Sequence, residues 1–294
     1  MILAKIQFGN QPGRAKVELE DLADAYVAAL VDAGQLGGEY FLTWFQGLFY
    51  AHVLMACSQA RQARYHSDSG RKRLAEVTEA FGQTPQWILM DDDARKHDAS
   101  WKRAPFLYLF THAFSNWVSP VRRGDNGKPI PVCLLPVSFE QKEYIYRWEC
   151  SYFHHDNIWL GCGALEVAAY RQMADPKSDL AETGRDLCRE IERATGVPTF
   201  YYLDRYWRRK VGEEDRRCPV CGGRWWSKRP ASGMKPFWQF GFRCDRCRLV
   251  SHFGVSDDGG SHTRIGEFPK PKQDAGQNLK RLRQGRDVRP SSQR

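Results

Sequence analysis

The hydrophobic pattern of the first ninety residues alternates between strand-like and helix-like periods. MILAKIQF, at the start of the chain, alternates apolar and polar side chains as a half-buried strand does. Apolar side chains at helical spacing predict helices over residues 19–34 and 70–82. Aromatic, β-prone runs predict further strands within residues 39–58, around a Gln46–Gly47 turn, and the pattern of residues 84–91 predicts a last strand. The resulting order, β-α-β-β-α-β, is that of the ferredoxin-like split motif, which serves many functions.

A second block of mixed pattern follows a polar, linker-like run at residues 91–98. VCLLP, at residues 132–136, predicts a short strand, and residues 139–157 are helical at least at their start. The clearest helix begins after Asp175–Pro176 and ends at Gly196. Residues 198–207 predict a strand. The block is therefore expected to be a central α/β unit.

Positive charge is concentrated in the last quarter of the chain. The net charge of the whole chain is +9, and residues 216–253 hold nine Lys or Arg against one Asp. Residues 269–294 hold eight Lys or Arg against two Asp, and they lack the apolar side chains that a core needs. We therefore expect a disordered basic tail and a polyanionic partner for this end of the molecule, although a solvated surface explains the charge equally well.

Composition otherwise describes an ordinary globular protein. Hydrophobic residues make up 42% and charged residues 27% of the 294 positions. The longest apolar run, residues 104–118, is too short and too polar for a membrane span, and the N-terminus lacks the pattern of a signal peptide. These features predict a cytoplasmic protein without a membrane partner. Nine cysteines, an odd number without regular spacing, disfavour a disulfide framework.

Four of those cysteines have metal-ligand spacing. Cys218 and Cys221 form one C-x-x-C pair, and Cys244 and Cys247 form a second pair 22 residues later. Thiolates in such paired turns converge on a tetrahedral zinc ion, and a full shell of four makes the zinc structural. A redox role for one pair is the rival interpretation, but it suits a single pair beside a β-α-β unit. We expect one structural zinc.

Aromatic and basic residues surround this motif. Neighbouring positions on a strand face opposite sides, so Trp225 and Trp226 cannot both enter one core. An exposed tryptophan among cations suits single-stranded or unpaired nucleic acid, whereas packing of the zinc unit on the rest of the protein is the competing interpretation. The candidate nucleic-acid contacts are Arg217, Arg224, Trp225, Trp226, Lys228, Arg229, Lys235, Trp238, Arg243, Arg246 and Arg248.

Several stretches resemble a family of uncharacterised bacterial proteins described as zinc-ribbon-containing and as candidate nucleic-acid binders. The resemblance is carried by SPVRRGDNGKPIP (119–131), GRDLCREIERATGVPTFYYLDR (184–205), CPVCGGRW (218–225) and CDRCRLVS (244–251). It covers most of residues 1–253 and implies that Cys218, Cys221, Cys244 and Cys247 are ligands. It implies no established activity.

An enzyme is the least favoured class. The candidate groups are His112, the neighbouring His154 and His155, and the run Asp91–Asp92–Asp93, and the sequence contains no phosphate-binding loop or nucleophile elbow. Any catalytic site is expected within residues 96–215. The favoured function is binding of nucleic acid or of a nucleic-acid-associated complex, and the alternative is a protein-interaction adaptor.

The fold class predicted from these patterns is α+β. We expect a ferredoxin-like domain over residues 1–95, the central block over 96–215, a zinc ribbon with four cysteine ligands over 216–268 and the basic tail over 269–294.

Overall fold

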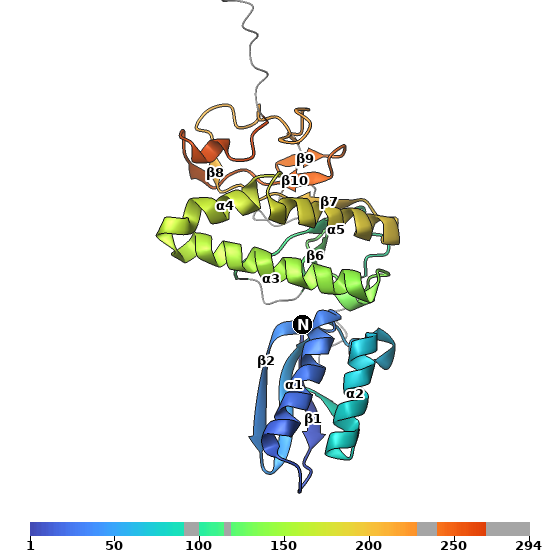
Figure 1. Ribbon diagram of the computed structural model, residues 1–294. Coiled ribbons are helices and arrows are strands. Elements are labelled where there is room, and N and C mark those ends of the chain that lie inside the picture. The colour runs from blue at the N-terminus through green and yellow to red at the C-terminus, as the bar shows by residue number, and fades with distance from the viewer. Residues whose placement is uncertain (91–99, 115–118, 228–239, 269–294) are drawn as a thin grey trace, which may run out of the picture.

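The protein is a mixed α and β structure with several sheets, as its sequence predicts. The computed structural model describes residues 1–90, 100–114, 119–227 and 240–268. The described chain forms three layers in sequence order, with the N-terminal unit below the central helices and the cysteine-rich unit above them (Figure 1). The predicted linker at 91–98 and tail at 269–294 lie outside the described residues.

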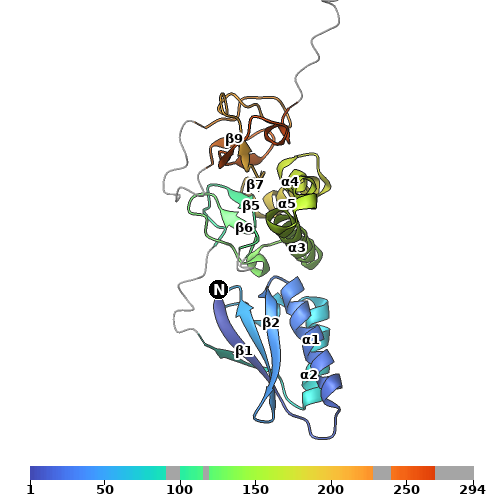
Figure 2. The same ribbon diagram turned by 90° about the vertical axis from the view of Figure 1, so that its left-hand side faces the viewer.

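The N-terminal unit is a four-stranded antiparallel sheet with two helices on one face (Figure 2). The strands lie in the order β2-β3-β1-β4, so the first and last strands are neighbours. The predicted hairpin is present, because Phe45 pairs with Leu48 across Gln46 and Gly47, whose φ angles are 49° and 77°. The elements are β1 (Ile2–Gly9), α1 (Lys16–Asp32), β2 (Leu36–Phe45), β3 (Leu48–Met55), α2 (Asp68–Phe81) and β4 (Gln86–Leu89).

A five-stranded sheet carries the rest of the molecule. Its order is β6-β5-β7-β10-β9, with β5, β7 and β10 parallel to one another and the two edge strands antiparallel to their neighbours. The elements in this part are β5 (Leu107–Leu109), β6 (Val121–Arg123), α3 (Phe139–Gly161), α4 (Glu166–Ala174), α5 (Asp179–Thr195), β7 (Thr199–Tyr202), β8 (Trp207–Arg208), β9 (Phe242–Cys244), β10 (Leu249–Ser251) and β11 (Ser256–Asp257).

The two faces of this sheet bury different side chains. Leu107, Leu109 and Tyr201 face α3 and α5 in the larger core. Their neighbours in sequence, together with Phe240 and Val250, form a second, mostly aromatic cluster, whose other members are Phe106, Tyr108, Phe110, Phe200 and Tyr202. This alternation follows from the two-residue period of strand side chains. The sheet thus crosses residue 215, so the predicted central block and cysteine-rich unit share one sheet and one core.

Two predicted elements of the central block are wrong in detail. Val132–Leu134 is a 3-10 helix and not a strand, because the Leu134 and Leu135 amides donate to carbonyls three residues back. The strand predicted over 198–207 is two short strands, β7 and β8. The helix predicted from residue 139 continues to Gly161, and its start has a capping box between Ser138 and Gln141. None of the helices in the described ranges is both long and apolar enough to cross a membrane.

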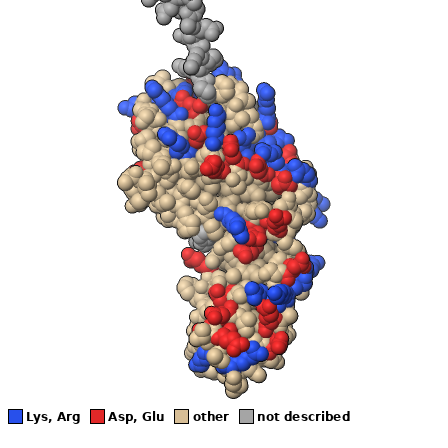
Figure 3. All heavy atoms as spheres, viewed as in Figure 1, with Lys and Arg blue, Asp and Glu red and all other residues tan. Residues whose placement is uncertain are grey.

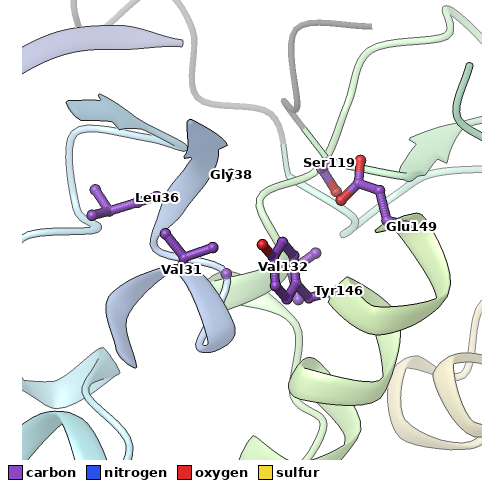
Figure 4. A pocket seen from close by; sticks show the side chains of 8 residues that line it. Val31, Leu36, Gly38, Ser119, Val132, Tyr146 and Glu149 are labelled. Carbon is purple, nitrogen blue, oxygen red and sulfur yellow. The ribbon is translucent and has the colours of Figure 1, made fainter. Parts of the chain in front are cut away.

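A small cavity lies at the boundary between the N-terminal and central units (Figure 4). Its volume is about 20 Å³, room for about one water molecule. Val31 and Leu36 line it from the N-terminal unit, and Ser119, Val132, Tyr146 and Glu149 line it from the central unit. Burial raises the pKa of Glu149 to about 8, against the opposing effects of Arg122 and the Thr111 hydroxyl. The boundary therefore holds a carboxyl group that the fold keeps largely protonated at neutral pH.

Glu149→Gln should remove a pH dependence of stability. The pKa of Glu149 is above its ordinary value of 4.5 in the folded protein, so folding favours the protonated form and stability falls as pH rises from 4.5 toward about 8. The slope from this one group is at most about 1.4 kcal/mol per pH unit. Urea unfolding from pH 5 to 8 should show the wild type losing stability relative to Glu149→Gln; parallel profiles would contradict this assignment.

Candidate metal centre and its basic surroundings

The first cysteine pair lies in a tight turn closed by backbone hydrogen bonds. The Gly222 amide donates to the Cys218 carbonyl at 2.8 Å, and the Cys218 amide donates to the Gly223 carbonyl at 2.8 Å. Gly222 has a φ of 70°, in the left-handed region that glycine adopts without strain. This turn brings the Cys218 and Cys221 side chains to the same side.

The second pair lies on the hairpin of β9 and β10, where Cys244 pairs with Leu249. Arg248 follows the second cysteine as Gly222 does in the first pair, and its φ of 51° is also left-handed. An arginine holds this conformation because both its backbone and its side chain are fixed by polar contacts. Its carbonyl accepts the Tyr201 amide at 2.8 Å, and its guanidinium pairs with Glu192 at 2.8 Å.

The four sulfurs form one group that could hold a metal ion. The ligand atoms of Cys218, Cys221, Cys244 and Cys247 all lie within 4.8 Å of one another. The Cys221 and Cys244 sulfurs are 3.8 Å apart. A tetrahedron with metal–sulfur bonds of about 2.3 Å has edges of about 3.8 Å, so this distance fits a shared ion.

The thiols strongly influence one another's ionisation. Burial raises the pKa of Cys221, but the Gly223 amide and the neighbouring thiols outweigh it and lower that pKa to about 7. Burial is the main cause that raises the pKa of Cys218 to about 11. One thiolate is therefore stabilised by its neighbours while further ionisation is opposed. A bound cation would supply the charge that lets all of them ionise.

The two tryptophans after the first pair have different environments. Trp225 is 2% exposed and packs on Phe242, with ring centroids 5.0 Å apart. The Arg205 guanidinium lies 5.5 Å from the centre of the same ring. Trp226 is half-buried and packs at the edge of the larger core. Trp225 is therefore withdrawn from any exposed stacking surface, as the docking interpretation expects.

The predicted basic contacts divide into engaged and open residues. Arg243 pairs with Asp245 at 2.7 Å and lies 4.7 Å from the Phe106 and Phe200 ring centres. Arg248 pairs with Glu192. Arg217, Arg224 and Arg246 are exposed, and within the described ranges they form no ion pair. Lys228, Arg229, Lys235 and Trp238 lie outside the described residues.

The structure adds a basic groove that sequence reasoning missed. Two adjoining hollows of about 760 and 450 Å³ share Arg264 and Glu267 in their walls. Their cations are Arg171, Lys177, Arg209, Lys210 and Arg264. Arg209 pairs with Glu267 at 2.7 Å, while the described residues provide no ion pair for the other four. These cations are scattered widely along the chain, so no local charge run could have revealed the groove. Figure 3 shows Lys and Arg gathered over the upper, C-terminal part of the molecule, with acidic side chains among them.

Two of the candidate catalytic histidines, His112 and His155, make local structural contacts. The Nδ1 atom of His112 accepts the Phe114 amide at 3.2 Å, and burial lowers the pKa of His112 to about 4. His155 Nδ1 contacts the Ser151 carbonyl one helical turn back, and His154 is exposed on the same helix, α3. Asp91, Asp92 and Asp93 lie outside the described residues.

Comparison with known proteins finds relatives without an assigned activity. Three domain families of unknown function match: DUF8589 over residues 1–91, DUF2310 over 102–204 and DUF8594 over 208–257. An uncharacterised protein of Haemophilus influenzae is 31% identical over 166 residues, which are 56% of this chain and 79% of the relative. The chain belongs to the same family of uncharacterised bacterial proteins.

A second member from Haemophilus influenzae is also uncharacterised. It is 31% identical over 166 residues, and this chain covers 62% of its length. No solved structure matches the chain significantly.

Cys218→Ser and Cys244→Ser should each abolish metal binding and destabilise more than the cysteine-rich unit. Cys244 lies on β9, which shares a sheet with β7, so loss of the metal should also loosen the central block. The N-terminal unit has its own sheet and core and should remain folded. Elemental analysis and hydrogen exchange would measure both effects, with the exposed Cys162→Ser as control. Metal retained at wild-type level in both variants would refute the site.

Trp225→Ala should destabilise the fold, whereas Trp226→Ala should cost less. Emptying a buried tryptophan site costs about 3–5 kcal/mol, and a half-buried ring loses less packing. Chemical denaturation of the two variants would compare them. Equal, small losses would mean that Trp225 is not a core residue in solution.

Proposed function

We propose that the protein binds the phosphate backbone of nucleic acid through a basic surface built around one structural zinc ion. The observation that carries this proposal is the set of open arginines, Arg217, Arg224 and Arg246, which flank the two cysteine turns without an acidic partner among the described residues. Phosphate contacts from arginine are charge-assisted and require no base readout.

Zinc is the metal that suits the cysteine group best. Four thiolates with tetrahedral spacing are the ligand set of structural zinc sites. A full shell leaves no position for a substrate, so the ion stabilises the fold and takes no part in a reaction. In small zinc-binding units, binding of the metal contributes about 10–16 kcal/mol to the free energy of folding, which is enough to hold short strands such as β9 and β10 in place.

We further propose that the N-terminal unit is a ferredoxin-like domain and that the C-terminal unit is a zinc ribbon. The β2-β3-β1-β4 order with both helices on one face supports the first assignment. A paired-cysteine turn facing a cysteine-bearing hairpin supports the second. We also propose that the protein acts in the cytoplasm, where nucleic acid is the abundant polyanion.

The burial of Trp225 changes the expected mode of binding. A buried ring cannot stack on bases, so the proposal rests on charge rather than on an aromatic platform. The groove around Arg171, Lys177, Lys210 and Arg264 lies where the central block meets the C-terminal unit and can extend the path of a phosphate backbone. Binding of this kind is weakly sequence-specific.

A protein-interaction adaptor is the second candidate. The same burial of Trp225 favours a C-terminal unit that is docked permanently on the central block, as expected of a structural ribbon. The open arginines would then meet an acidic protein surface. Nucleic acid is the preferred ligand because the cations extend over two separate regions, which suits an extended polyanion better than a compact acidic patch.

Replacing Arg217, Arg224 and Arg246 together by alanine should weaken oligonucleotide binding and flatten its salt dependence. Each phosphate contact contributes about 0.7 to the slope of log affinity against log salt for single strands, so three lost contacts lower the slope by about 2. Fluorescence anisotropy with a short unstructured oligonucleotide at several salt concentrations would measure this.

The matched control removes three cations from other surfaces, through Arg61→Ala, Lys72→Ala and Lys128→Ala. It should leave the slope nearly unchanged, because these residues lie in the N-terminal unit and in the loop after β6. Deleting residues 269–294, which carry eight Lys or Arg and two Asp, should also flatten the slope without loss of zinc. Absence of binding at low salt by the zinc-loaded wild type would discard nucleic acid and leave the adaptor.

A further inference from the structure

Two thiols from different structural units meet at the boundary below the central helices. Cys57 follows β3 of the N-terminal unit, and Cys133 lies in the 3-10 helix Val132–Leu134 of the central unit. Both are buried, with exposed fractions of 0% and 1%, and they share a small apolar cluster with Ala60. The Cys57 side chain is close enough to be the main cause that raises the pKa of Cys133. The zinc centre and the open arginines involve neither residue.

Backbone hydrogen bonds fix the positions of both cysteines. The Cys133 amide donates to the Gly34 carbonyl at 3.3 Å, which joins the two units directly. Gly34 has a φ of 67°, and a Cβ atom there would lie 2.5 Å from the Val132 Cβ, so the approach of the two backbones requires glycine. On the other side, the Ala60 amide donates to the Cys57 carbonyl at 3.1 Å. Both thiols are therefore carried by closely fixed turns.

A buried lysine supplies positive charge beside the pair. Lys142 is 5% exposed, its Nζ atom donates to the Cys133 carbonyl at 3.2 Å, and it lies 4.6 Å from the centre of the Phe139 ring. The Cys57 side chain, followed by burial, raises the pKa of Cys133, and the Lys142 charge opposes this rise. The resting pair is thus a dithiol in which Lys142 favours any negative charge that forms on Cys133.

We propose that Cys57 and Cys133 are a reversible disulfide site that a small hydroperoxide oxidises, joining the N-terminal and central units covalently. In the first step the Cys133 thiolate attacks one peroxide oxygen, the O–O bond breaks, and protonation yields a sulfenic acid and water. In the second step the Cys57 sulfur attacks the sulfenic sulfur, the S–O bond breaks, and the hydroxyl leaves as a second water with the Cys57 proton. Two thiols and one hydrogen peroxide thus give one disulfide and two waters.

Hydrogen peroxide is the suitable oxidant class because it is uncharged and little larger than water. A bulky disulfide such as oxidised glutathione cannot reach sulfurs that are this deeply buried without opening of the boundary. The boundary is imperfectly filled nearby, since the cavity of about 20 Å³ is lined by Gly34 and Val132, which adjoin Cys133. This inference does not rest on nucleic-acid binding.

The test treats the reduced, zinc-loaded full chain with hydrogen peroxide under native conditions. After the thiols have been blocked with iodoacetamide, peptide mass spectrometry without reduction should show Cys57 linked to Cys133, and dithiothreitol should restore both thiols. The peptide readout is specific for this pair, so oxidation of the zinc thiolates does not confuse it. Both cysteines remaining fully alkylated as thiols, or linked to other cysteines, would overturn the proposal.

Variants of the same chain assign the steps. Cys57→Ser should accumulate a sulfenic acid at Cys133 that dimedone traps, and Cys188→Ser, which removes another buried thiol, should leave the Cys57–Cys133 link unchanged. Lys142→Met should slow formation of the link several-fold, because the positive charge beside the attacking sulfur is lost. Trapping at Cys57 in Cys133→Ser but not at Cys133 in Cys57→Ser, or an unchanged rate in Lys142→Met, would overturn Cys133 as the attacking thiol.

Discussion

The parallel pairing of β10 with β7 is the interaction on which the C-terminal half of the molecule depends. The Tyr201 amide donates to the Arg248 carbonyl at 2.8 Å, and the Leu203 amide donates to the Val250 carbonyl at 2.9 Å. β10 therefore continues the central sheet, and β9 becomes its edge. The first cysteine turn is tied to that edge, because the Arg243 amide donates to the Trp225 carbonyl at 2.6 Å. The four-cysteine group is thus an extension of the central sheet, and its strands of three residues are too short to stand alone.

Buried charge reinforces the same junction. Arg216 is 2% exposed and donates to Glu213 at 2.9 Å and to Glu267 at 3.0 Å. Arg205, also 2% exposed, lies against the rings of Trp225 and Phe242, and burial is the main cause that lowers its pKa to about 10. It therefore stays charged at neutral pH. Removing one partner of such a group leaves an uncompensated buried charge, so the junction is specific as well as apolar.

Local signals in the sequence were enough for most of the elements but not for their assembly. Alternation in residues 1–8, the Gln46–Gly47 turn and the cysteine spacing each act within a few residues, and the structure contains the strand, the hairpin and the four-cysteine group they predict. The burial of Trp225 and the placing of β10 beside β7 depend on partners far away in sequence. Pro131 and Pro136 enclose Val132–Leu135, and proline disfavours a central strand, so apolar content alone did not predict the 3-10 turn found there.

Distant partners also decide which of the positive charges in the sequence are exposed and which are used within the fold. Arg243 and Arg248 belong to the most basic stretch of the chain, yet the first lies over two aromatic rings and the second closes a cysteine turn through Glu192, 56 residues away. Substituting either residue would disturb the fold and would therefore lower the affinity for any ligand only indirectly. Arg217, Arg224 and Arg246 come from the same stretch and project from the turns as exposed side chains. Among the described residues of this stretch, removing these three arginines lowers the exposed positive charge while leaving the ion pairs of Arg243 and Arg248 intact, so the charge that these residues offer to a partner is smaller than the sequence suggests.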